Sequence, residues 1–366
     1  MFDPLENRMM ARALELAERA IGITSPNPLV GAVVVKGGFE VGEGYHRRAG
    51  APHAEIVALR QAGKKARGAT LFVNLEPCCH HGRTPPCVEA IITSGIGRVV
   101  VAMRDPNPLV RGRGINALRR AGIKVEVGLM RAEARRLNEI FIHHITTGMP
   151  FVALKLAQTL DGAIAAAPGM RTAITSSPAL RLTHRLRSSY DAVMVGISTV
   201  LADDPLLNVR GVRGAKQPVR VILDSHLNIP PGSKLAATAG QFPTLVLYDP
   251  AGAAKQRMDA LAQKKVELAP VEGASGGLLP PRGVLKILAN RGITSVLIEG
   301  GKSVATSFLR KGTVQRLHLF IAPLLMGGAG PLHGLGDLGK LRKRLKLRDL
   351  ERRFVGPDTY VTGRLD

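Results

Sequence analysis

Glu76-Pro-Cys-Cys-His-His-Gly-Arg-Thr-Pro-Pro-Cys87 follows an expected buried strand, and His53-Ala-Glu55 stands at the start of an expected helix. Together the two stretches offer one imidazole and two thiolates, from His53, Cys78 and Cys87. Three protein ligands leave the fourth position of zinc open for water, which is the layout of a catalytic site. Both segments lie beside expected helix N-termini, whose positive dipole ends favour thiolate over thiol. We therefore expect a catalytic zinc centre in the first half of the chain.

Glu55 lies two residues from the ligand His53 and is placed to move protons rather than to bind metal. Zinc lowers the pKa of its bound water towards about 7, and a nearby carboxylate can pass the proton of that water to a departing amine. The combination predicts hydrolytic deamination of an amino-pyrimidine or purine ring.

Other residues in the same loop compete for the metal. Cys79, His80 and His81 are close in sequence to Cys78, but two adjacent cysteines cannot easily point at one ion, and we expect His80 or His81 to line the pocket. If either histidine were a fourth ligand, the site would be a closed structural zinc module without catalysis.

The rest of the pattern predicts two α/β domains, because 366 residues exceed the size at which one core usually stops growing. We expect a deaminase domain over residues 1–147 and a second domain over 151–366. Expected helices cover 5–20, 53–66, 179–188 and 302–311. Expected strands cover 29–35, 70–75, 99–102, 124–127, 151–155, 191–196, 219–223, 244–248, 294–298 and 316–322.

Charge and composition narrow the partners and the compartment. The 51 Lys and Arg against 28 Asp and Glu give a net charge of +23, which suits nucleic acid, anionic membranes or phosphorylated metabolites. No apolar stretch is long enough to span a membrane, the N-terminus lacks a signal-peptide layout, and all three cysteines fall between Cys78 and Cys87. We expect a cytoplasmic protein without a membrane partner.

A nucleic-acid deaminase is the competing hypothesis that the positive charge raises. Such enzymes carry Pro-Cys-x-x-Cys, whereas eight residues separate Cys78 from Cys87 here. The chain has four Tyr and no Trp for stacking on bases, and we find no RNA-binding signature in its second half. We therefore expect a phosphorylated pyrimidine as substrate and no nucleic-acid partner.

Several ordered motifs resemble the bifunctional riboflavin-biosynthesis deaminase/reductase family. In the first half they are Ser25-Pro-Asn-Pro-Leu-Val-Gly31, the two metal segments, and Asp105-Pro-Asn-Pro108. In the second half they are Leu154-Lys-Leu-Ala-Gln-Thr-Leu-Asp-Gly162, Gly196-Ile-Ser-Thr-Val-Leu-Ala-Asp-Asp-Pro205 and Leu297-Ile-Glu-Gly-Gly-Lys-Ser303. The resemblance implies a cytidine-deaminase-like three-layer domain, then a dihydrofolate-reductase-like α/β domain that uses NADPH. It also implies a homo-oligomer, a dimer or a tetramer.

The resemblance implies a role for particular residues in the deaminase half. His53, Cys78 and Cys87 would hold Zn²⁺, and Glu55 would donate and accept the proton. The residues implied around the pyrimidine and its phosphate are Asn27, His46, Arg83, Asp105 and Asn107. The implied reaction is deamination of 2,5-diamino-6-ribosylamino-4(3H)-pyrimidinone 5′-phosphate.

In the reductase half the resemblance implies hydride transfer that turns the ribosyl group into a ribityl chain. The residues implied for NADPH are Ala157, Thr199, Asp203, Gly301, Lys302, Ser303, Val304, Ala305, Thr306 and Ser307. The residues implied for the sugar-phosphate substrate are Arg187, Leu207, Arg210 and Glu299. Lys155 has a plainer interpretation as a charge at a strand edge.

One departure from the family's pattern lies between these motifs. Where the family has a Gly-x-Ser-x-Trp-Ile-Thr run, this chain reads Gly169-Met-Arg-Thr-Ala-Ile-Thr175, so Arg171 replaces the serine beside the substrate and Ala173 replaces the tryptophan beside the cofactor. Loss of the aromatic surface would weaken cofactor packing, while Arg171 could pair with a phosphate. The alternative is therefore a deaminase with a weakened or inactive reductase domain.

Overall fold

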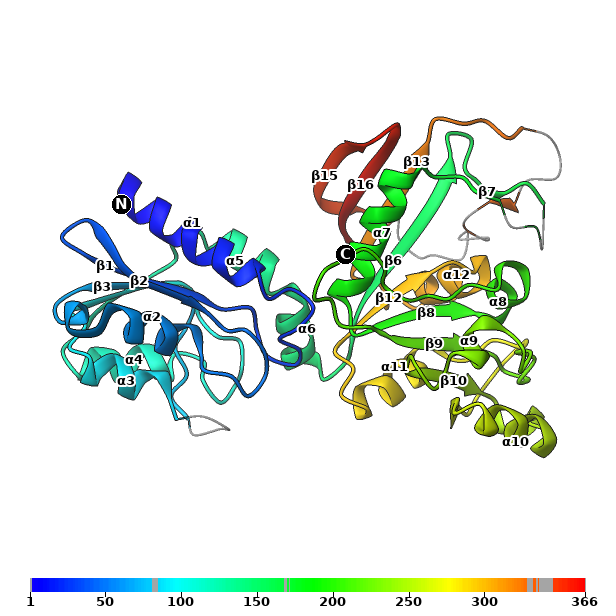
Figure 1. The fold of residues 1–366 in the computed structure, drawn as a ribbon, viewed down its shortest axis with the longest axis horizontal. Helices are drawn as coiled ribbons and strands as arrows, with labels where there is room; N and C mark the ends of the chain where they lie inside the picture. The colour runs from blue at the N-terminus through cyan, green and yellow to red at the C-terminus, as the bar shows by residue number, and fades with distance from the viewer. Residues whose placement is uncertain are drawn as a thin grey trace. The chain divides into compact units, whose positions relative to one another are not determined.

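The computed structural model describes residues 2–80, 85–167, 170, 172–327, 332–333, 335 and 345–365. The chain divides into two compact units, Met1–Gly148 and Met149–Asp366, and each is described by itself. Both are α/β units built around one main sheet (Figure 1). In the described part of the chain no helix is both long and apolar enough to cross a membrane.

The first unit contains a five-stranded sheet of order β2-β1-β3-β4-β5. Its strands are β1 (Gly31–Lys36), β2 (Phe39–Tyr45), β3 (Thr70–Leu75), β4 (Arg98–Met103) and β5 (Lys124–Val127). β1 runs antiparallel to both β2 and β3, whereas β3, β4 and β5 are parallel. The carboxyl ends of these three parallel strands therefore meet at one edge, where the chain can bring side chains together.

Helices cover both faces of this sheet. They are α1 (Pro4–Glu18), α2 (Ala54–Ala62), α3 (Cys87–Thr93), α4 (Arg113–Arg120), α5 (Arg131–Leu137) and α6 (Glu139–Thr147). Side chains alternate along a strand, so Val34 packs under α2 to α4 while Val33 and Val35 pack under α1 and α5. Figure 1 shows these two layers on opposite sides of the sheet. The unit is thus a three-layer domain.

Strand β2 was not expected from the sequence, which shows only a glycine-rich turn before it. Two of its residues are glycines, and both lie directly beneath α2. A Cβ at Gly42 would lie 2.3 Å from the Ala58 main-chain oxygen, and one at Gly44 would lie 2.6 Å from Val57 Cβ. Glycine inside a strand marks such a close approach of another backbone, and here it lets α2 sit against the sheet.

The second unit contains a nine-stranded sheet of order β11-β10-β9-β8-β12-β6-β13-β16-β15, with β14 and β7 forming a separate pair. The seven strands from β11 to β13 in that order are parallel, and β16 and β15 continue the sheet antiparallel. The bounds are β6 (Phe151–Thr159), β7 (Ala163–Ala165), β8 (Ala192–Gly196), β9 (Val219–Leu223), β10 (Thr244–Tyr248), β11 (Glu267–Pro270), β12 (Ser295–Glu299), β13 (Arg316–Ala322), β14 (Leu332–His333), β15 (Leu347–Val355) and β16 (Asp358–Leu365).

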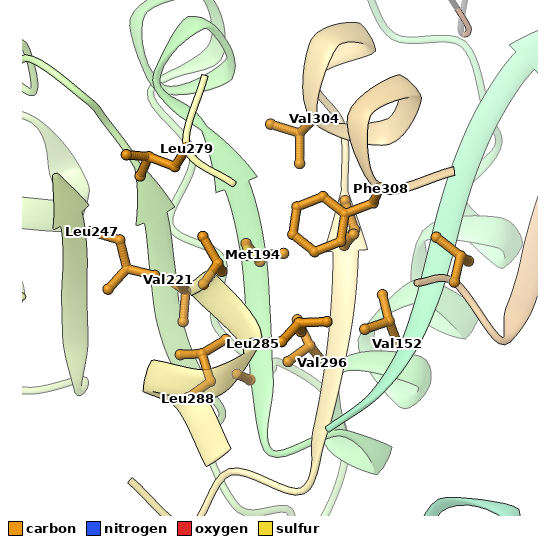
Figure 2. Close-up of a cluster of buried hydrophobic side chains, with 14 of the residues drawn as sticks. Val152, Met194, Val221, Leu247, Leu279, Leu285, Leu288, Val296, Val304 and Phe308 are labelled. Carbon is orange, nitrogen blue, oxygen red and sulfur yellow. The ribbon is translucent and has the colours of Figure 1, made fainter. Parts of the chain in front are cut away.

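Helices cover both faces of the larger sheet as well. They are α7 (Ser177–Ser189), α8 (Ile197–Asp203), α9 (Lys234–Ala237), α10 (Lys255–Gln263), α11 (Pro281–Asn290) and α12 (Lys302–Arg310). The main core joins α11 and α12 to the sheet, with Leu285 and Phe308 packed around Met194 and Val296 (Figure 2). On the opposite face, α7 packs through Ala179. The strands expected over 219–223, 244–248 and 316–322 are confirmed to the residue.

Candidate active sites

The three expected zinc ligands converge at one point of the first unit. His53 Nδ1 lies 3.1 Å from Cys87 Sγ and 3.5 Å from Cys78 Sγ, and all three ligand atoms lie within 4.8 Å of one another. No other histidine, cysteine or carboxylate of the described residues joins this group. An imidazole and two sulfur atoms this close together fit a single zinc ion.

Two helix starts position these ligands. His53 is the residue before α2, Cys87 is the first residue of α3, and the Cys87 N–H donates to Cys78 Sγ at 3.3 Å. The pKa of the Cys78 thiol falls to about 4, chiefly through its hydrogen bond with the Cys87 thiol and also through His53, while burial opposes the change. Contact with Cys78 and burial raise the pKa of Cys87. The pair therefore provides one ready thiolate and shares one proton.

Glu55 lies in the first turn of α2 and is 3% exposed. Burial raises the pKa of its carboxyl group, and the negative charge of Cys78 raises it further, while His53 opposes the shift. A carboxyl group whose pKa is raised holds a proton more readily than an ordinary glutamate, which suits a residue that must take up a proton and give it away again.

A cavity of about 450 Å³ opens beside these residues. Its lining includes His53, Glu55 and Cys78 together with four of the residues that the resemblance implies for the substrate, which are Asn27, His46, Asp105 and Asn107. Asn27 Nδ2 lies 3.0 Å from His46 Nε2, and His46 Nδ1 lies 3.2 Å from the Pro52 carbonyl oxygen. Burial lowers the pKa of His46. The neutral imidazole thus offers one donor and one acceptor to its neighbours.

Asp105 and Asn107 share a loop that follows β4. Asp105 Oδ1 accepts from the Asn107 N–H at 2.8 Å, and burial raises the pKa of Asp105 to about 6. Glu76, a residue with no predicted role, holds this loop. Its carboxylate accepts hydrogen bonds from the N–H groups of Asp105 at 3.2 Å, Gly112 at 2.9 Å and Ile115 at 3.1 Å. The signal in the sequence was an acidic residue two positions before the motif cysteine Cys78.

The remaining candidates of this site divide into two groups. His80 lines the cavity and Cys79 lies 4.0 Å from the Leu109 oxygen, and neither belongs to the metal group. Arg83 and His81 lie outside the described residues. The closed four-ligand alternative therefore finds no fourth ligand among the residues that the structure describes.

In the second unit, Arg187 and Glu299 form a buried pair. Arg187 Nε lies 2.6 Å from Glu299 Oε1 and Nη2 lies 3.0 Å from Oε2, with side chains 12% and 6% exposed. Lys155 stands opposite Glu299 in the register of β6 and β12. Burial lowers the pKa of the Lys155 amine, Glu299 raises it and Arg187 lowers it. Lys155 is thus a half-buried amine beside the pair, and because β6 lies between β12 and β13 inside the sheet, the interpretation as a strand-edge charge is wrong.

The loop after α8 brings Leu207 and Arg210 close to α7, which carries Arg187 of the pair. Leu207 is 3% exposed and has a φ of 51°, and the Arg210 N–H donates to His184 Nδ1 at 3.3 Å. His184 and Arg187 both belong to α7, one turn apart. Arg210 itself is exposed, so its guanidinium is accessible to a ligand.

The carboxyl ends of β8 and β12 lie side by side, and each leads directly into a helix. Gly300 and Gly301 have φ of 89° and 85°, and a Cβ on either would come within 3.6 Å of Thr199 Oγ1. α12 starts at Lys302, so its first-turn N–H groups suit a phosphate. This chemistry fits a dinucleotide, which open α/β sheets bind at the carboxyl ends of their strands.

The other residues implied for the cofactor differ in how exposed they are. Val304, Ala305 and Thr306 are buried within α12 and Ser307 is half-buried; Ala157 is half-buried on β6, and Ala173 is exposed. Asp203 ends α8. Arg171 lies outside the described residues, so its pairing with a phosphate stays a prediction.

Family models match both halves of the chain. The cytidine and deoxycytidylate deaminase zinc-binding region matches residues 4–103, and the RibD C-terminal domain matches residues 150–361. The expected fold class, a deaminase-like domain followed by a reductase domain, is confirmed by these matches. They also support the expected cofactors, Zn²⁺ for the first domain and NADPH for the second.

Known relatives match over almost the whole length. The chain is 46% identical to the riboflavin biosynthesis protein RibD of Aquifex aeolicus, over 99% of both chains, and 41% identical to that of Escherichia coli, over 96% of this chain and 97% of the other. A solved structure of Acinetobacter baumannii RibD covers 99% of both chains at 37% identity with a TM-score of 0.87. The Thermotoga maritima diaminohydroxyphosphoribosylaminopyrimidine deaminase/5-amino-6-(5-phosphoribosylamino)uracil reductase covers the same share at 36% identity with a TM-score of 0.83.

Proposed function

The chain belongs to the family of bifunctional riboflavin biosynthesis proteins, and we propose that the residues described above carry its two reactions. The first domain deaminates 2,5-diamino-6-ribosylamino-4(3H)-pyrimidinone 5′-phosphate. The second reduces the ribosyl group of the product to a ribityl chain. The single observation that carries the proposal is that His53, Cys78 and Cys87 converge on one point, beside a cavity that His53, Cys78 and Glu55 line.

His53, Cys78 and Cys87 would hold zinc, which when bound lowers the pKa of a water molecule to about 7. Glu55 takes the proton of the attacking water and delivers it to the leaving amino group. A new C–O bond forms on the ring carbon while its C–N bond breaks, and ammonia leaves. The raised pKa of Glu55 supports both transfers, because the carboxyl group must hold the proton between them.

Asn27, His46, Asp105 and Asn107 orient the ring for this step. Amide and carboxylate groups suit the amino and carbonyl edges of a pyrimidine. Arg83 suits its phosphate, since a guanidinium binds phosphate through two parallel hydrogen bonds. The hydrogen bonds to Glu76 fix the loop of Asp105 and Asn107 to the start of the metal segment, which supports a preformed site.

In the second domain, NADPH when bound supplies a hydride to the ribosyl carbon that carries the amine. The bond from that carbon to the sugar ring oxygen breaks, and the oxygen takes up a proton to become a hydroxyl group. Lys155, half-buried opposite Glu299, is placed to give that proton. Arg187, Leu207, Arg210 and Glu299 would bind the sugar phosphate. The residues that would hold the cofactor are Ala157, Ala173, Thr199, Asp203 and the segment from Gly301 to Ser307.

Assembly and location complete the proposal. We infer a homodimer or homotetramer, supported by the edge strand β15, which exposes Leu350 and Phe354, the latter at 81%. We place the protein in the cytoplasm, because two cysteines that bind zinc as thiolates need a reducing compartment. Light scattering of the purified chain tests the assembly.

The decisive experiment is mass spectrometry of the purified protein with the diamino substrate, with and without NADPH. A gain of roughly one dalton without NADPH reports deamination, and roughly two more with it reports reduction. Deamination alone would support the alternative in which Ala173 and Arg171 weaken the reductase. No change in mass would overturn the proposal.

A further inference from the structure

Asn208 carries a buried oxygen that no described residue satisfies. Its side chain belongs to a residue only 9% exposed, and Oδ1 has no hydrogen-bond partner. Among the described residues, the only other buried side-chain atom without a hydrogen-bond partner is Asp224 Oδ1. The other oxygen of that carboxylate, Oδ2, accepts a hydrogen bond from the Ile229 N–H at 2.7 Å. Nearly all buried side-chain oxygens in proteins are hydrogen-bonded, so such an atom requires an explanation.

The segment around Asn208 is held in place on both sides. Its main-chain oxygen accepts from Arg187 Nη1 at 3.0 Å and also contacts the His184 ring. On the other side, the Val209 N–H donates to Gln217 Oε1 at 2.8 Å, and Gln217 Nε2 donates back to the Val209 oxygen at 2.9 Å. Because the backbone is fixed in this way, the side-chain oxygen cannot shift far to find a partner.

The neighbours of Asn208 indicate which part of a ligand it would meet. Leu207 precedes Asn208 and Arg210 follows it two residues later. The Arg187 side chain donates a hydrogen bond to the main-chain oxygen of Asn208. These are the residues to which the proposed function assigns the sugar phosphate. An ionised phosphate offers only acceptors, so an acceptor such as Asn208 Oδ1 cannot bind it directly. The sugar, which is the part of the substrate next to the phosphate, offers hydroxyl donors.

We propose that Asn208 is a specificity residue of the reductase site, whose Oδ1 accepts a hydrogen bond from a ribosyl hydroxyl group of the substrate. This inference rests on the proposed reductase function. A site built to bond a hydroxyl group rejects an analogue that lacks it, because the buried acceptor then stays unpaired. Asn208 would thus distinguish ribosyl from deoxyribosyl substrates, while Arg187 and Arg210 bind the phosphate that both share.

The test compares the full-length wild-type enzyme with N208L, which removes the acceptor at similar size, and with N208A. The control is N290L, the same change at an exposed residue that ends α11. Each protein is assayed with NADPH and the deaminated substrate, and with its 2′-deoxy and 3′-deoxy forms. We expect wild type and N290L to prefer the ribosyl substrate over one deoxy form by about 10- to 100-fold in kcat/KM, and both Asn208 variants to lose that preference.

Two further measurements separate this role from a structural one. N208L should raise KM for the ribosyl substrate and leave KM for NADPH unchanged, because the hydroxyl group belongs to the substrate. The melting temperature of the ligand-free protein should not fall, since leucine removes an unsatisfied polar group. A lower melting temperature with changes in both KM values would overturn the inference, as would a KM effect on NADPH alone.

The wild-type result stands even if both variants fail to fold. Equal kcat/KM for the ribosyl and both deoxy substrates would show that no acceptor reads these hydroxyl groups, and the inference would be wrong. Its failure is distinct from that of the proposed function, because wild type must first reduce the ribosyl substrate. If wild type does not reduce it at all, the reductase proposal itself fails.

Discussion

Replacing Glu299 by glutamine should destabilise the second domain. Among the described residues, it removes the one negative charge that faces both the buried Arg187 side chain and the half-buried Lys155 amine. Arg187 binds both carboxylate oxygens, at 2.6 and 3.0 Å, and Lys155 lies opposite in the neighbouring strand. Burial alone would raise the pKa of Glu299, yet Arg187 and Lys155 lower it overall. The pair therefore depends on the negative charge.

The size of the effect follows from the burial of the pair. Its side chains are 12% and 6% exposed, so water screens the charges little. Removing one partner of a buried pair costs about 3–5 kcal/mol. Glutamine keeps the shape and one acceptor, so we expect the lower end, about 3 kcal/mol, which raises the equilibrium constant for opening about 150-fold.

Hydrogen exchange measured by mass spectrometry resolves the two domains in one experiment. In the E299Q protein, amides of β12 and β6 should exchange faster, while β3 and α1 of the other domain serve as internal controls. A double variant with Arg187→Met and Glu299→Leu should recover part of the lost stability without recovering reductase activity. Apolar residues of similar volume often replace a buried pair without loss, but Lys155 still lacks the carboxylate opposite it. Unchanged exchange in β12 of E299Q would refute the reasoning.

Three other predictions can be tested directly. Glu55→Gln should slow deamination at least about 100-fold with zinc content unchanged by atomic absorption; a wild-type rate would contradict the proton-transfer role. Burial lowers the pKa of His318 from 6.5 to about 3, so as pH falls the unfolded chain binds the proton first. The stability that neutral His318 contributes is complete above pH 6.5 and falls by about 1.4 kcal/mol for each pH unit between pH 6.5 and pH 3. The free energy of unfolding, measured by urea titration, should therefore depend less on pH in His318→Gln than in wild type. Gly42→Ala would place a Cβ 2.3 Å from a main-chain oxygen and should lower the melting temperature, at a cost of about 1–3 kcal/mol, whereas Gly232→Ala, with nothing within 4 Å, should not.

The sequence predicted the fold best where strands are fully buried. The runs over 70–75 and 219–223 are short and mostly apolar, each with one polar residue in its interior, Asn74 and Arg220, and the structure has strands there with the same bounds. The sequence did not predict β2. The first two residues of this strand are exposed, and its buried residues are the glycines Gly42 and Gly44. Strand patterns are recognised from side chains that pack on the sheet. A strand that contacts a helix through glycine backbone provides no such pattern.

The candidate sites show the same division. His53, Cys78 and Cys87 could be predicted because zinc requires particular side-chain types, and the structure brings them together. Glu76 and Lys155 could not be assigned in this way. Glu76 accepts hydrogen bonds from backbone N–H groups, which every residue except proline carries, and Lys155 matters because it lies opposite Glu299 in the register of β6 and β12. Neither property depends on a residue type that a sequence displays.

The three hydrogen bonds of Glu76 hold the loop from Asp105 to Gly112 and the first turn of α4, and they make this loop an exchangeable part of the first domain. The loop is attached to the metal segment by its own main-chain N–H groups, and its side chains at 105 and 107 line the cavity. A replacement loop of equal length that presents the same N–H groups can carry other side chains at these positions without displacing Cys78. The loop is therefore the segment to exchange as one unit when other side chains are to be placed at positions 105 and 107 of the cavity.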